Sequence, residues 1–345
     1  MKRVLRYAVV FTLLFMLALT GCEKEPENEK KDVEENDRIL IGFSFDNFVM
    51  ERWERDRDIF VSKMNEMGAD VNVQNANGSV EVQKNQISYF IEKGCDVIVI
   101  VAIDGDSLKD EVKKAHDAGI KVVAYDRLIN DADVDLYITF DNYKVGSFLA
   151  EAVNEAVAGE KNVILLTGPT TDNNVGYLND GFNEISDANK FNMLDVQYFE
   201  GWNQDLGYQY VNNNIELVEK ADAIICGNDA IAGQVIRGLS EHRLAGKIVV
   251  AGQDADLESC QRIVEGTQYM TVYKPINELA ESAASYVYLL AEDEDMSFTG
   301  SISDGTNFIP YVAIKPYAVT RENMDELIID SGFHRREDVY LNVEP

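Results

Sequence analysis

The sequence predicts an α/β protein made of two similar lobes, each built around a doubly wound parallel sheet. From Arg38 onward, short apolar runs alternate with longer segments of helical period, which is the pattern of βαβ units. One strand–helix–strand pattern occurs twice along the chain. After residue 37 of the 345-residue chain, about three hundred residues remain, enough for two domains of ordinary size.

Four apolar runs in the first half of the chain have the length and composition of strands. The segment Ser107–Ala118 has helical period, with Leu108, Val112 and Ala115 on one face and lysines on the other. Apolar strands separated by such helices are typical of parallel sheets covered on both sides. The expected strands are Ile39–Phe45, Val71–Gln74, Val97–Val101 and Val122–Tyr125.

The repeat relates one stretch of the first half to one of the second half. Residues 95–104 read CDVIVIVAID, and residues 221–230 read ADAIICGNDA. Each is followed by an amphipathic helix and by a strand that ends in aspartate, KVVAYD at 121–126 and KIVVAGQD at 247–254. The interval from Asp96 to Lys121 is 25 residues, and so is the interval from Asp222 to Lys247. The shared order and spacing indicate two homologous lobes.

The N-terminal residues predict export and a lipid anchor. Three basic residues within the first six precede the apolar run Tyr7–Leu19, which is too short to span a bilayer comfortably and is typical of a secretory signal. The run ends in LTGC at 19–22, which resembles the bacterial lipobox, in which the chain is cut before the cysteine and the new terminus carries lipid. We expect residues 1–21 to be a signal peptide and Cys22 to be lipidated. An uncleaved membrane anchor is the alternative.

Residues 22–37 are expected to form an acidic tether between the lipid and the body of the protein. From Glu23 to Asp37 nearly every residue is charged or polar, with Pro26 and no hydrophobic period. Such a segment buries too little apolar surface to offset the entropy of ordering it. A poorly marked helix is the alternative for this segment.

Charge and cysteine content exclude several classes of protein. The formal charge of −30 at pH 7 argues against a nucleic-acid partner, because neutralising phosphates takes a basic patch. Besides Cys22, the chain has Cys95, Cys226 and Cys260, in no metal-ligand spacing. We expect these three to be buried apolar residues. Their odd number leaves a single disulfide between two of them open.

Polar residues recur where the predicted strands end. Asp126 and Arg127 follow one strand, Asn228 and Asp229 follow another, and Asp254 follows a third. Open parallel sheets bind ligands in crevices at the carboxyl ends of their strands, so these residues would line a cleft between facing lobes. Aspartate and asparagine at such places also cap the next helix, and for any single residue this alternative is equally good. For the whole set, a ligand site is the better interpretation.

No catalytic or cofactor-binding motif is present in the sequence. The chain lacks a G-x-S-x-G elbow, a G-x-x-x-x-G-K-[ST] loop and a G-x-G-x-x-G turn after the first strand. His116, His242 and His334 are expected on solvated faces, and no His, Cys or carboxylate cluster has metal spacing. The acidic run Asp131–Asp135 lacks the glycine and distal glutamate of a calcium loop, and we expect a solvated turn. We therefore predict a binding protein with no metal and no cofactor, not an enzyme.

The remaining polar and aromatic residues suit a polyhydroxylated ligand. Carboxylates and amides form hydrogen bonds in fixed directions, and Arg and Lys add charge-assisted donors. Trp53 and Trp202 are the only tryptophans, and Trp202 follows the strand-like Val196–Phe199 and precedes a helix. It should therefore lie near the rim of a lobe. Stacking on a sugar ring is the favoured role of Trp202, and ordinary packing is the alternative.

From Ile41 to the C-terminus the chain carries a series of short motifs. They are ERWERDRDIF at 51–60, AYDR at 124–127, FDN at 140–142, DNN at 172–174, GW at 201–202, NDA at 228–230, GQDAD at 252–256 and TVYKP at 271–275. With these motifs the chain resembles the periplasmic sugar-binding proteins of type I fold, and within them the D-xylose-binding proteins of ABC transporters. Related multiple-sugar receptors share AYDR, FDN and GQDA. Two departures, the missing proline before DNN and a divergent segment after Ala291, bear on the stereochemistry of the sugar.

The resemblance implies a pocket drawn from both lobes, with a monosaccharide as ligand and D-xylose favoured. Lys274 enters through the resemblance alone, whereas Asp126, Asn228 and Asp254 also follow from the strand-end pattern. The implied ligand-binding residues are Arg52, Trp53, Asp126, Arg127, Asn174, Trp202, Asn228, Asp254 and Lys274.

Proteins of this family cross between their lobes three times, so the resemblance also implies a three-segment hinge. We expect the crossings near Asp141–Lys144, Pro275–Asn277 and Asp304–Asn307. The N-terminal lobe would then comprise residues 38–141 and 277–304, and the C-terminal lobe residues 142–276 and 305–337. A ligand that bridges the lobes would stabilise a closed state that a membrane partner recognises.

We expect that partner to be an ABC sugar permease, and the chain itself to be a monomer. A receptor kinase or chemoreceptor would use the same outer surface, so sensing of xylose or of several sugars is the alternative. A sugar-modifying enzyme would need a base of tuned pKa beside a nucleophile or metal. A repressor of this fold would need a basic helix-turn-helix where the signal and tether lie.

Overall fold

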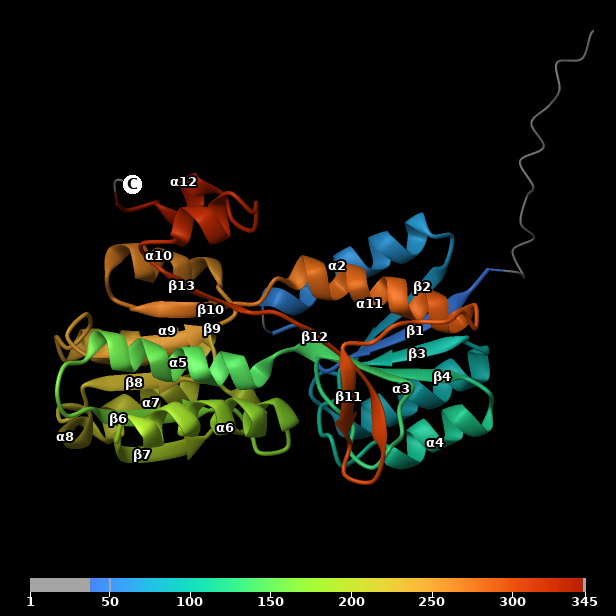
Figure 1. Ribbon diagram of the computed structural model, residues 1–345, viewed down its shortest axis with the longest axis horizontal. Helices are drawn as coiled ribbons and strands as arrows, with labels where there is room; N and C mark the ends of the chain where they lie inside the picture. The colour runs from blue at the N-terminus through green and yellow to red at the C-terminus, as the bar shows by residue number, and fades with distance from the viewer. Residues whose placement is uncertain (1–37, 50, 344–345) are drawn as a thin grey trace, which may run out of the picture. The chain divides into compact units, whose positions relative to one another are not determined.

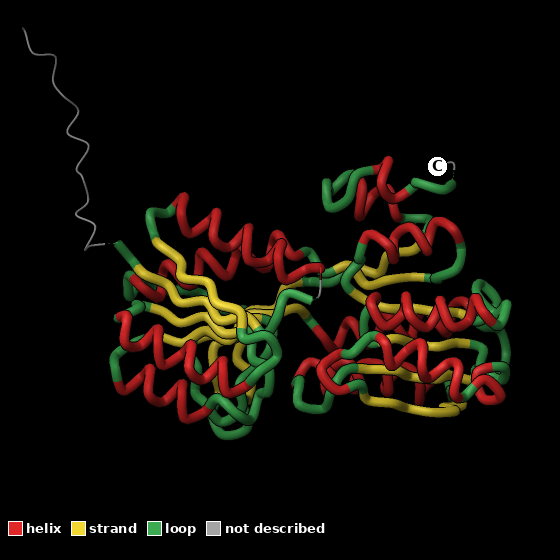
Figure 2. Tube along the Cα trace, turned by 180° about the vertical axis from the view of Figure 1, so that it is seen from behind, coloured by secondary structure: helices red, strands yellow, loops and turns green. Residues whose placement is uncertain are grey.

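The computed structural model describes residues 38–49 and 51–343. The predicted signal peptide, the lipidation site Cys22 and the tether at 22–37 lie outside these residues. The described chain forms two α/β lobes, each a sheet with helices on both faces (Figures 1 and 2). Among the described residues, no helix is long and apolar enough to cross a membrane.

The sheet of the N-terminal lobe has seven strands in the order β11-β12-β5-β4-β3-β1-β2. All neighbours pair in parallel except β11 and β12. Helices α2 (Glu51–Glu66) and α11 (Ile276–Ala291) cover one face, and α3 (Val80–Lys93) and α4 (Lys109–Asp117) cover the other (Figure 1). The strands are β1 (Leu40–Phe45), β2 (Asp70–Asn75), β3 (Val97–Ile100), β4 (Lys121–Tyr125), β5 (Leu136–Phe140), β11 (Gly300–Ser303) and β12 (Phe308–Ile314).

The sheet of the C-terminal lobe has six strands in the order β13-β10-β9-β8-β6-β7, with only β13 antiparallel to its neighbour. Helices α5 (Asn142–Ala156) and α6 (Asn173–Ala188) cover one face, and α7 (Asp205–Asn213) and α9 (Asp229–Glu241) cover the other. Helix α10 (Leu257–Glu265) packs with the C-terminal segment. The strands are β6 (Asn162–Thr167), β7 (Asn192–Tyr198), β8 (Ala223–Cys226), β9 (Val249–Gln253), β10 (Met270–Tyr273) and β13 (Tyr317–Thr320); the short helices are η1 (Glu200–Trp202), α8 (Ile215–Val218), η2 (Asp325–Ile329) and α12 (Arg336–Val339).

The two lobes follow one plan, as the sequence repeat predicts. The run β5-β4-β3-β1-β2 in one sheet corresponds to β10-β9-β8-β6-β7 in the other. The repeated stretches form β3 and β8, and the second strands of the repeat form β4 and β9, at matching places in the two sheets. The predicted helix on the Ser107–Ala118 segment is α4, with Val112 and Ala115 buried. The predicted fold class is confirmed.

The chain passes from one sheet to the other after β5, after β10 and after β12. The expectation of a third crossing at Asp304–Asn307 is therefore wrong, because residues 308–314 still belong to the N-terminal lobe. There Phe308–Ile314 pairs in parallel with β5 and antiparallel with β11. The crossing itself falls between Ile314 and Tyr317, and residues 305–314 move from the predicted C-terminal lobe to the N-terminal lobe.

Asp304 belongs to the turn between β11 and β12, and it holds a second turn in place. Its Oδ2 accepts hydrogen bonds from the backbone of Ala132 at 2.9 Å and of Asp133 at 2.8 Å, and its Oδ1 accepts from the backbone of Asn307 at 2.7 Å. The acidic run Asp131–Asp135 is thus an anchored turn rather than a merely solvated one.

Four other expectations concern single residues away from the cleft. Cys95, Cys226 and Cys260 are buried, as expected for small apolar residues. His334 was expected on a solvated face, but it is buried, and its Nε2 lies 2.8 Å from the carbonyl oxygen of Ala255. This contact could not be predicted from the sequence, because the two residues are far apart in the chain.

Candidate ligand-binding site

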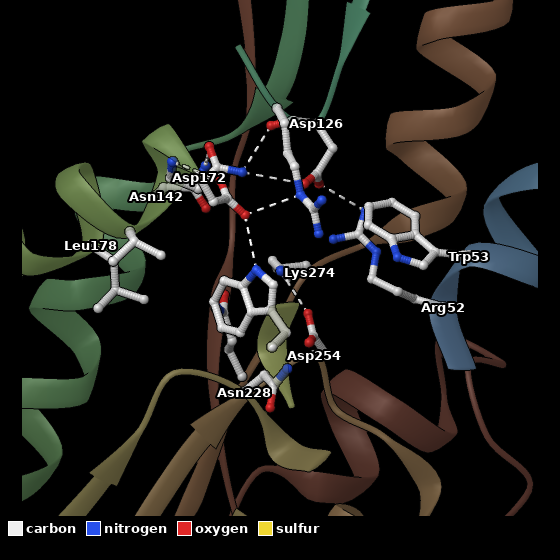
Figure 3. Close-up of a pocket in the computed structure, with 14 residues that line it drawn as sticks. Arg52, Trp53, Asp126, Asn142, Asp172, Leu178, Asn228, Asp254 and Lys274 are labelled. Atoms are coloured by element: carbon white, nitrogen blue, oxygen red, sulfur yellow. Dashed lines mark hydrogen bonds and ion pairs between the residues drawn. The ribbon is translucent and has the colours of Figure 1, made fainter. Parts of the chain in front are cut away.

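The strands of both sheets end at one cleft between the lobes. A pocket in this cleft has about 410 Å³ of space unfilled by protein atoms, part of it open to solvent. Strand ends and helix starts of both lobes supply its walls (Figure 3), as expected for the crevice of an open parallel sheet.

Helix α2 and the end of β4 supply the charged wall of the N-terminal lobe. Arg52 lies in the first turn of α2, and its Nη2 lies 2.9 Å from Oδ2 of Asp126, directly after β4. The next residue, Arg127, donates from Nη1 to Oδ2 of Asp46 at 2.7 Å. Burial works to raise the pKa of Asp126, but Arg52, Lys274 and Arg127 outweigh it and lower that pKa. Asp126 is therefore a charged acceptor at neutral pH.

The C-terminal lobe contributes a second buried ion pair and the starts of two helices. Lys274 follows β10, and its Nζ lies 2.6 Å from Oδ1 of Asp254, which follows β9. Asp172 caps the N-terminus of α6, and Asn228 caps that of α9 by accepting a backbone hydrogen bond at 2.9 Å. The capping alternative holds for Asn228, yet the same residue also lines the pocket. The two roles coexist.

Trp202 comes from η1, just after β7, and its ring lies against the backbone of two strand ends. A Cβ atom added to Gly168, after β6, would lie 2.3 Å from Cζ2 of the indole, and one added to Gly227, after β8, would lie 3.0 Å from Cζ3. Nε1 of Trp202 donates to Oδ2 of Asp172 at 3.1 Å. Glycine at both strand ends therefore lets the indole approach this closely and line the pocket.

Arg127 and Asn174 join the lobes inside the cleft. Nε of Arg127 lies 3.0 Å from Oδ2 of Asp172, although the two residues belong to different lobes. Asn174, at the start of α6, donates from Nδ2 to the backbone carbonyl of Asp126 at 2.9 Å. Its Oδ1 accepts from the Tyr137 hydroxyl at 2.9 Å. Asn174 thus ties α6 to the end of β4.

Further contacts join the lobes beside the pocket. The backbone N–H of Gly105 donates to the carbonyl oxygen of Thr171 at 3.2 Å. The side chain of Asn173 donates to Oδ1 of Asn130 at 2.8 Å. Because these contacts connect loops of the N-terminal lobe to the start of α6, the structure describes a closed arrangement of the lobes.

Two buried polar atoms of the pocket have neither a hydrogen-bond partner nor an ion-pair partner among the described residues. They are Nε1 of Trp53 and Oε1 of Gln253. Leaving such a group unpaired costs about 1–3 kcal/mol, so it needs an explanation. One free donor and one free acceptor in the same pocket suit hydroxyl groups, which both donate and accept.

The backbone at the strand ends adopts conformations that are uncommon for residues other than glycine. The φ angles are 64° at Asp126, 56° at Trp202, 106° at Asp254 and 55° at Ala255. Each such residue costs free energy, and residues of this kind cluster at ligand sites in proteins. Three of these four side chains line the pocket, so part of the backbone strain of the described residues lies at the predicted ligand site, although other such residues lie elsewhere.

The structure brings all nine predicted ligand-binding residues to this one pocket: Arg52, Trp53, Asp126, Arg127, Asn174, Trp202, Asn228, Asp254 and Lys274. That they contact a ligand stays a prediction. Five further lining residues were not selected from the sequence: Asn142, Asp172, Val175, Leu178 and Gln253. Asn142, Asp172 and Gln253 lie within the motifs FDN, DNN and GQDAD, so the motifs carried the signal that could have found them. Val175 and Leu178 have the spacing of apolar residues that face the core from a helix, so the sequence does not mark them as pocket residues.

The chemistry of the lining is that of a binding site. The pocket has no serine, cysteine or histidine in its lining. Among the described residues, no group of His, Cys, Asp or Glu could hold a metal ion. The charged side chains of the pocket are paired with one another, which suits recognition of a polar ligand.

Comparison with known proteins establishes the family. Residues 41–295 match the periplasmic binding protein domain. The chain belongs to this family. The D-xylose-binding periplasmic protein of Haemophilus influenzae is 40% identical over 307 residues, which cover 88% of this chain and 92% of that protein. The protein of the same name from Escherichia coli is 39% identical over 306 residues, which cover 87% of this chain and 92% of that protein.

A solved structure of the same family supports the fold assignment. An ABC transporter solute-binding protein from Clostridium phytofermentans with bound β-D-glucose has a TM-score of 0.79 and 27% identity, covering 87% of this chain and 99% of that one. The predicted family resemblance is confirmed. Both relatives are named as sugar-binding periplasmic proteins, so the kinship also confirms the prediction that this periplasmic binding protein is not an enzyme.

Proposed function

We propose that this periplasmic binding protein is an extracytoplasmic lipoprotein that binds a monosaccharide, D-xylose being favoured, and delivers it to an ABC sugar permease. The observation that carries the proposal is the pocket, in which nine residues predicted from the sequence come together from both lobes. The two relatives named as D-xylose-binding proteins, at 40% and 39% identity, support the choice of sugar.

The charge of the pocket favours an uncharged ligand. Three cationic and three anionic side chains line it, so its formal charge is zero: Arg52, Arg127, Lys274, Asp126, Asp172 and Asp254. A uronate or a sugar phosphate would add a negative charge to a pocket whose positive and negative charges already balance. An unbalanced charge in a buried site is costly. A neutral sugar brings only hydroxyl groups, each of which can accept from a cation and donate to a carboxylate.

The geometry gives each part of the pocket a role in the proposed binding. Asp126 and Asp254 would accept hydrogen bonds from sugar hydroxyls, and Arg52 and Lys274 would donate to hydroxyl oxygens. The indole of Trp202, held against the two glycines, offers an apolar platform on which C–H groups of a sugar ring can stack. A ligand held in this way touches both lobes and stabilises the closed arrangement relative to an open one.

The proposed location and anchoring depend on the N-terminal sequence. The basic start, the apolar run and the LTGC motif at 19–22 support export and lipid attachment at Cys22. The proposed monomer, tethered by residues 22–37, would then present closed lobes to a permease in the same membrane. A membrane-bound sensor in place of the permease is the second candidate.

A broader sugar range is favoured by one specific observation. The multiple sugar-binding periplasmic receptor of Rhizobium radiobacter is 27% identical over 328 residues, which cover 88% of this chain and 93% of that receptor. Affinities for a panel of sugars separate the two possibilities. Preference for D-xylose supports the main proposal, and tighter binding of glucose, galactose or arabinose supports the multiple-sugar receptor.

The test is calorimetry on the purified body, without residues 1–22, with D-xylose and other pentoses and hexoses. We expect saturable binding of D-xylose at one site and recovery of the sugar unchanged. Failure to bind any sugar of the panel would refute the proposed function. Turnover of a sugar into another product would contradict the binding-protein assignment.

A further inference from the structure

A buried polar pair lies beneath the pocket without lining it. Asp56 is on α2, one turn after Arg52, and Tyr125 is the last residue of β4. Both side chains are fully buried, and neither belongs to the pocket lining. Their surroundings are the apolar core between α2 and the sheet, with Phe43 and Phe60 among its members.

The pair contacts a residue of the pocket on the side away from the ligand space. Oδ2 of Asp56 accepts from Nε of Arg52 at 3.2 Å, and Oδ1 accepts from Nη2 at 3.4 Å. The hydroxyl of Tyr125 donates to the same Oδ1 of Asp56. Arg52 is thus held from behind by Asp56, while its Nη2 also lies 2.9 Å from Asp126.

These contacts leave one end of the guanidinium for the pocket. Of the three nitrogens, Nε and Nη2 are engaged by Asp56 and Asp126. Among the described residues, none accepts a hydrogen bond from Nη1. Because the guanidinium is planar and rigid, fixing two of its nitrogens also fixes the third.

The stability of the fold does not by itself explain why residue 56 is an aspartate. A buried charge carries a large desolvation cost, and an apolar residue of similar size often packs there at no loss. Burial raises the pKa of Asp56, and Arg52 opposes that rise only in part. Asp58, two residues further along α2, carries the same carboxylate without this desolvation cost, because 69% of its side chain is exposed.

We propose that Asp56, oriented by the Tyr125 hydroxyl, is a positioning residue that fixes the guanidinium of Arg52 for ligand binding. Asp56 does not touch the ligand; it sets the direction of the donor that does. This inference rests on the proposed function, because it assigns Asp56 a part in sugar binding through Arg52.

The test measures D-xylose affinity by calorimetry for the wild type and for Asp56→Asn, Tyr125→Phe and Asp58→Asn. We expect Asp56→Asn to bind about 10–50-fold more weakly, because the substitution removes a charge-assisted fork. Tyr125→Phe, which removes only a hydroxyl, should bind about 3–10-fold more weakly. Asp58→Asn, on the same helix but exposed, is the matched control and should bind like the wild type.

A double-mutant cycle separates positioning from a general loss of stability. If Asp56 acts through Arg52, the double variant Arg52→Gln/Asp56→Asn should bind no more weakly than Arg52→Gln alone. Additive losses would overturn the inference, as would wild-type affinity in both Asp56→Asn and Tyr125→Phe. If the wild type itself binds no D-xylose, the choice of sugar under the proposed function fails, and the same comparison is then made with the sugar of the panel that the wild type does bind. Should Asp56→Asn not fold, Tyr125→Phe alone decides, with wild-type affinity counting against the inference.

Discussion

Gly168→Ala should weaken sugar binding by displacing Trp202, although Gly168 itself carries no side chain. The added Cβ would lie 2.3–2.5 Å from three atoms of the indole. Ordinary contacts of a Cβ atom begin near 3.4 Å, so the ring must move by about 1 Å or more. The backbone at Gly168 is outside the left-handed region, so alanine adds no backbone strain and the ring takes the whole displacement.

The magnitude follows from what the displaced ring loses. A shift of that size stretches the 3.1 Å hydrogen bond from Nε1 of Trp202 to Asp172 and moves the stacking surface away from the sugar. Loss of an aromatic contact costs about 0.5–1.5 kcal/mol and loss of a hydrogen bond to a charged group about 1.5–3 kcal/mol. Since the second loss is partial, we expect about 1.5–3 kcal/mol in total, which is about 10–150-fold in Kd.

Calorimetry with D-xylose measures this loss, and two variants control it. Gly176→Ala, on α6 in the same lobe, places its Cβ where no atom lies within 4 Å, so it should bind like the wild type. In a Trp202→Ala background, Gly168→Ala should have no further effect, because the ring that it displaces is gone. Wild-type affinity for Gly168→Ala would refute the reasoning, and so would an equal loss in the Trp202→Ala background.

Three further predictions concern a ligand contact, the β11–β12 turn and the anchor. Asp254→Ala should weaken D-xylose binding by about 2–4 kcal/mol in calorimetry and Asp254→Asn by less; equal, unchanged affinities would remove Asp254 from the site. Although burial works to raise it, backbone hydrogen bonds lower the pKa of Asp304 to about 2 from 3.8. Its stabilisation is therefore present above about pH 4 and is lost as the pH falls towards 2, so Asp304→Asn should cost about 1–2 kcal/mol at neutral pH and progressively less on acidification. Denaturant unfolding at several pH values measures this, and a pH-independent difference would contradict it. Cys22→Ser should abolish metabolic labelling with a fatty acid and release the folded protein, whereas labelling equal to the wild type would rule out the lipobox interpretation.

Much of the site could be predicted because strand ends are visible in the sequence. Asp126 and Asp254 directly follow the predicted strands, and the geometry of parallel sheets brings such ends to one edge. Asp172 was harder to select, because it caps α6 and a capping aspartate is common at any helix start. Its partner Arg127 lies in the other lobe, and the sequence does not indicate which residues two lobes bring together.

The third crossing shows a different limit of prediction. A turn at residues 304–307 looks the same in sequence whether it leads to the other lobe or back along the same sheet. The choice depends on the pairing of Phe308–Ile314 with β5, which is about 170 residues earlier in the chain. The same distance explains why the contact between Asp304 and the acidic turn was missed.

The three crossings have a consequence for how the chain is made. The N-terminal lobe needs α11, which ends at Ala291, and β12, which ends at Ile314, and the C-terminal lobe needs β13, which ends at Thr320. A chain that emerges N-terminus first, from a ribosome or through a membrane pore, cannot complete either lobe until nearly all of it has appeared. Pairing of strands so distant in sequence is also slow. The connectivity that builds the hinge therefore keeps the nascent chain unfolded for longer. An unfolded chain is the form that can be translocated through a membrane pore.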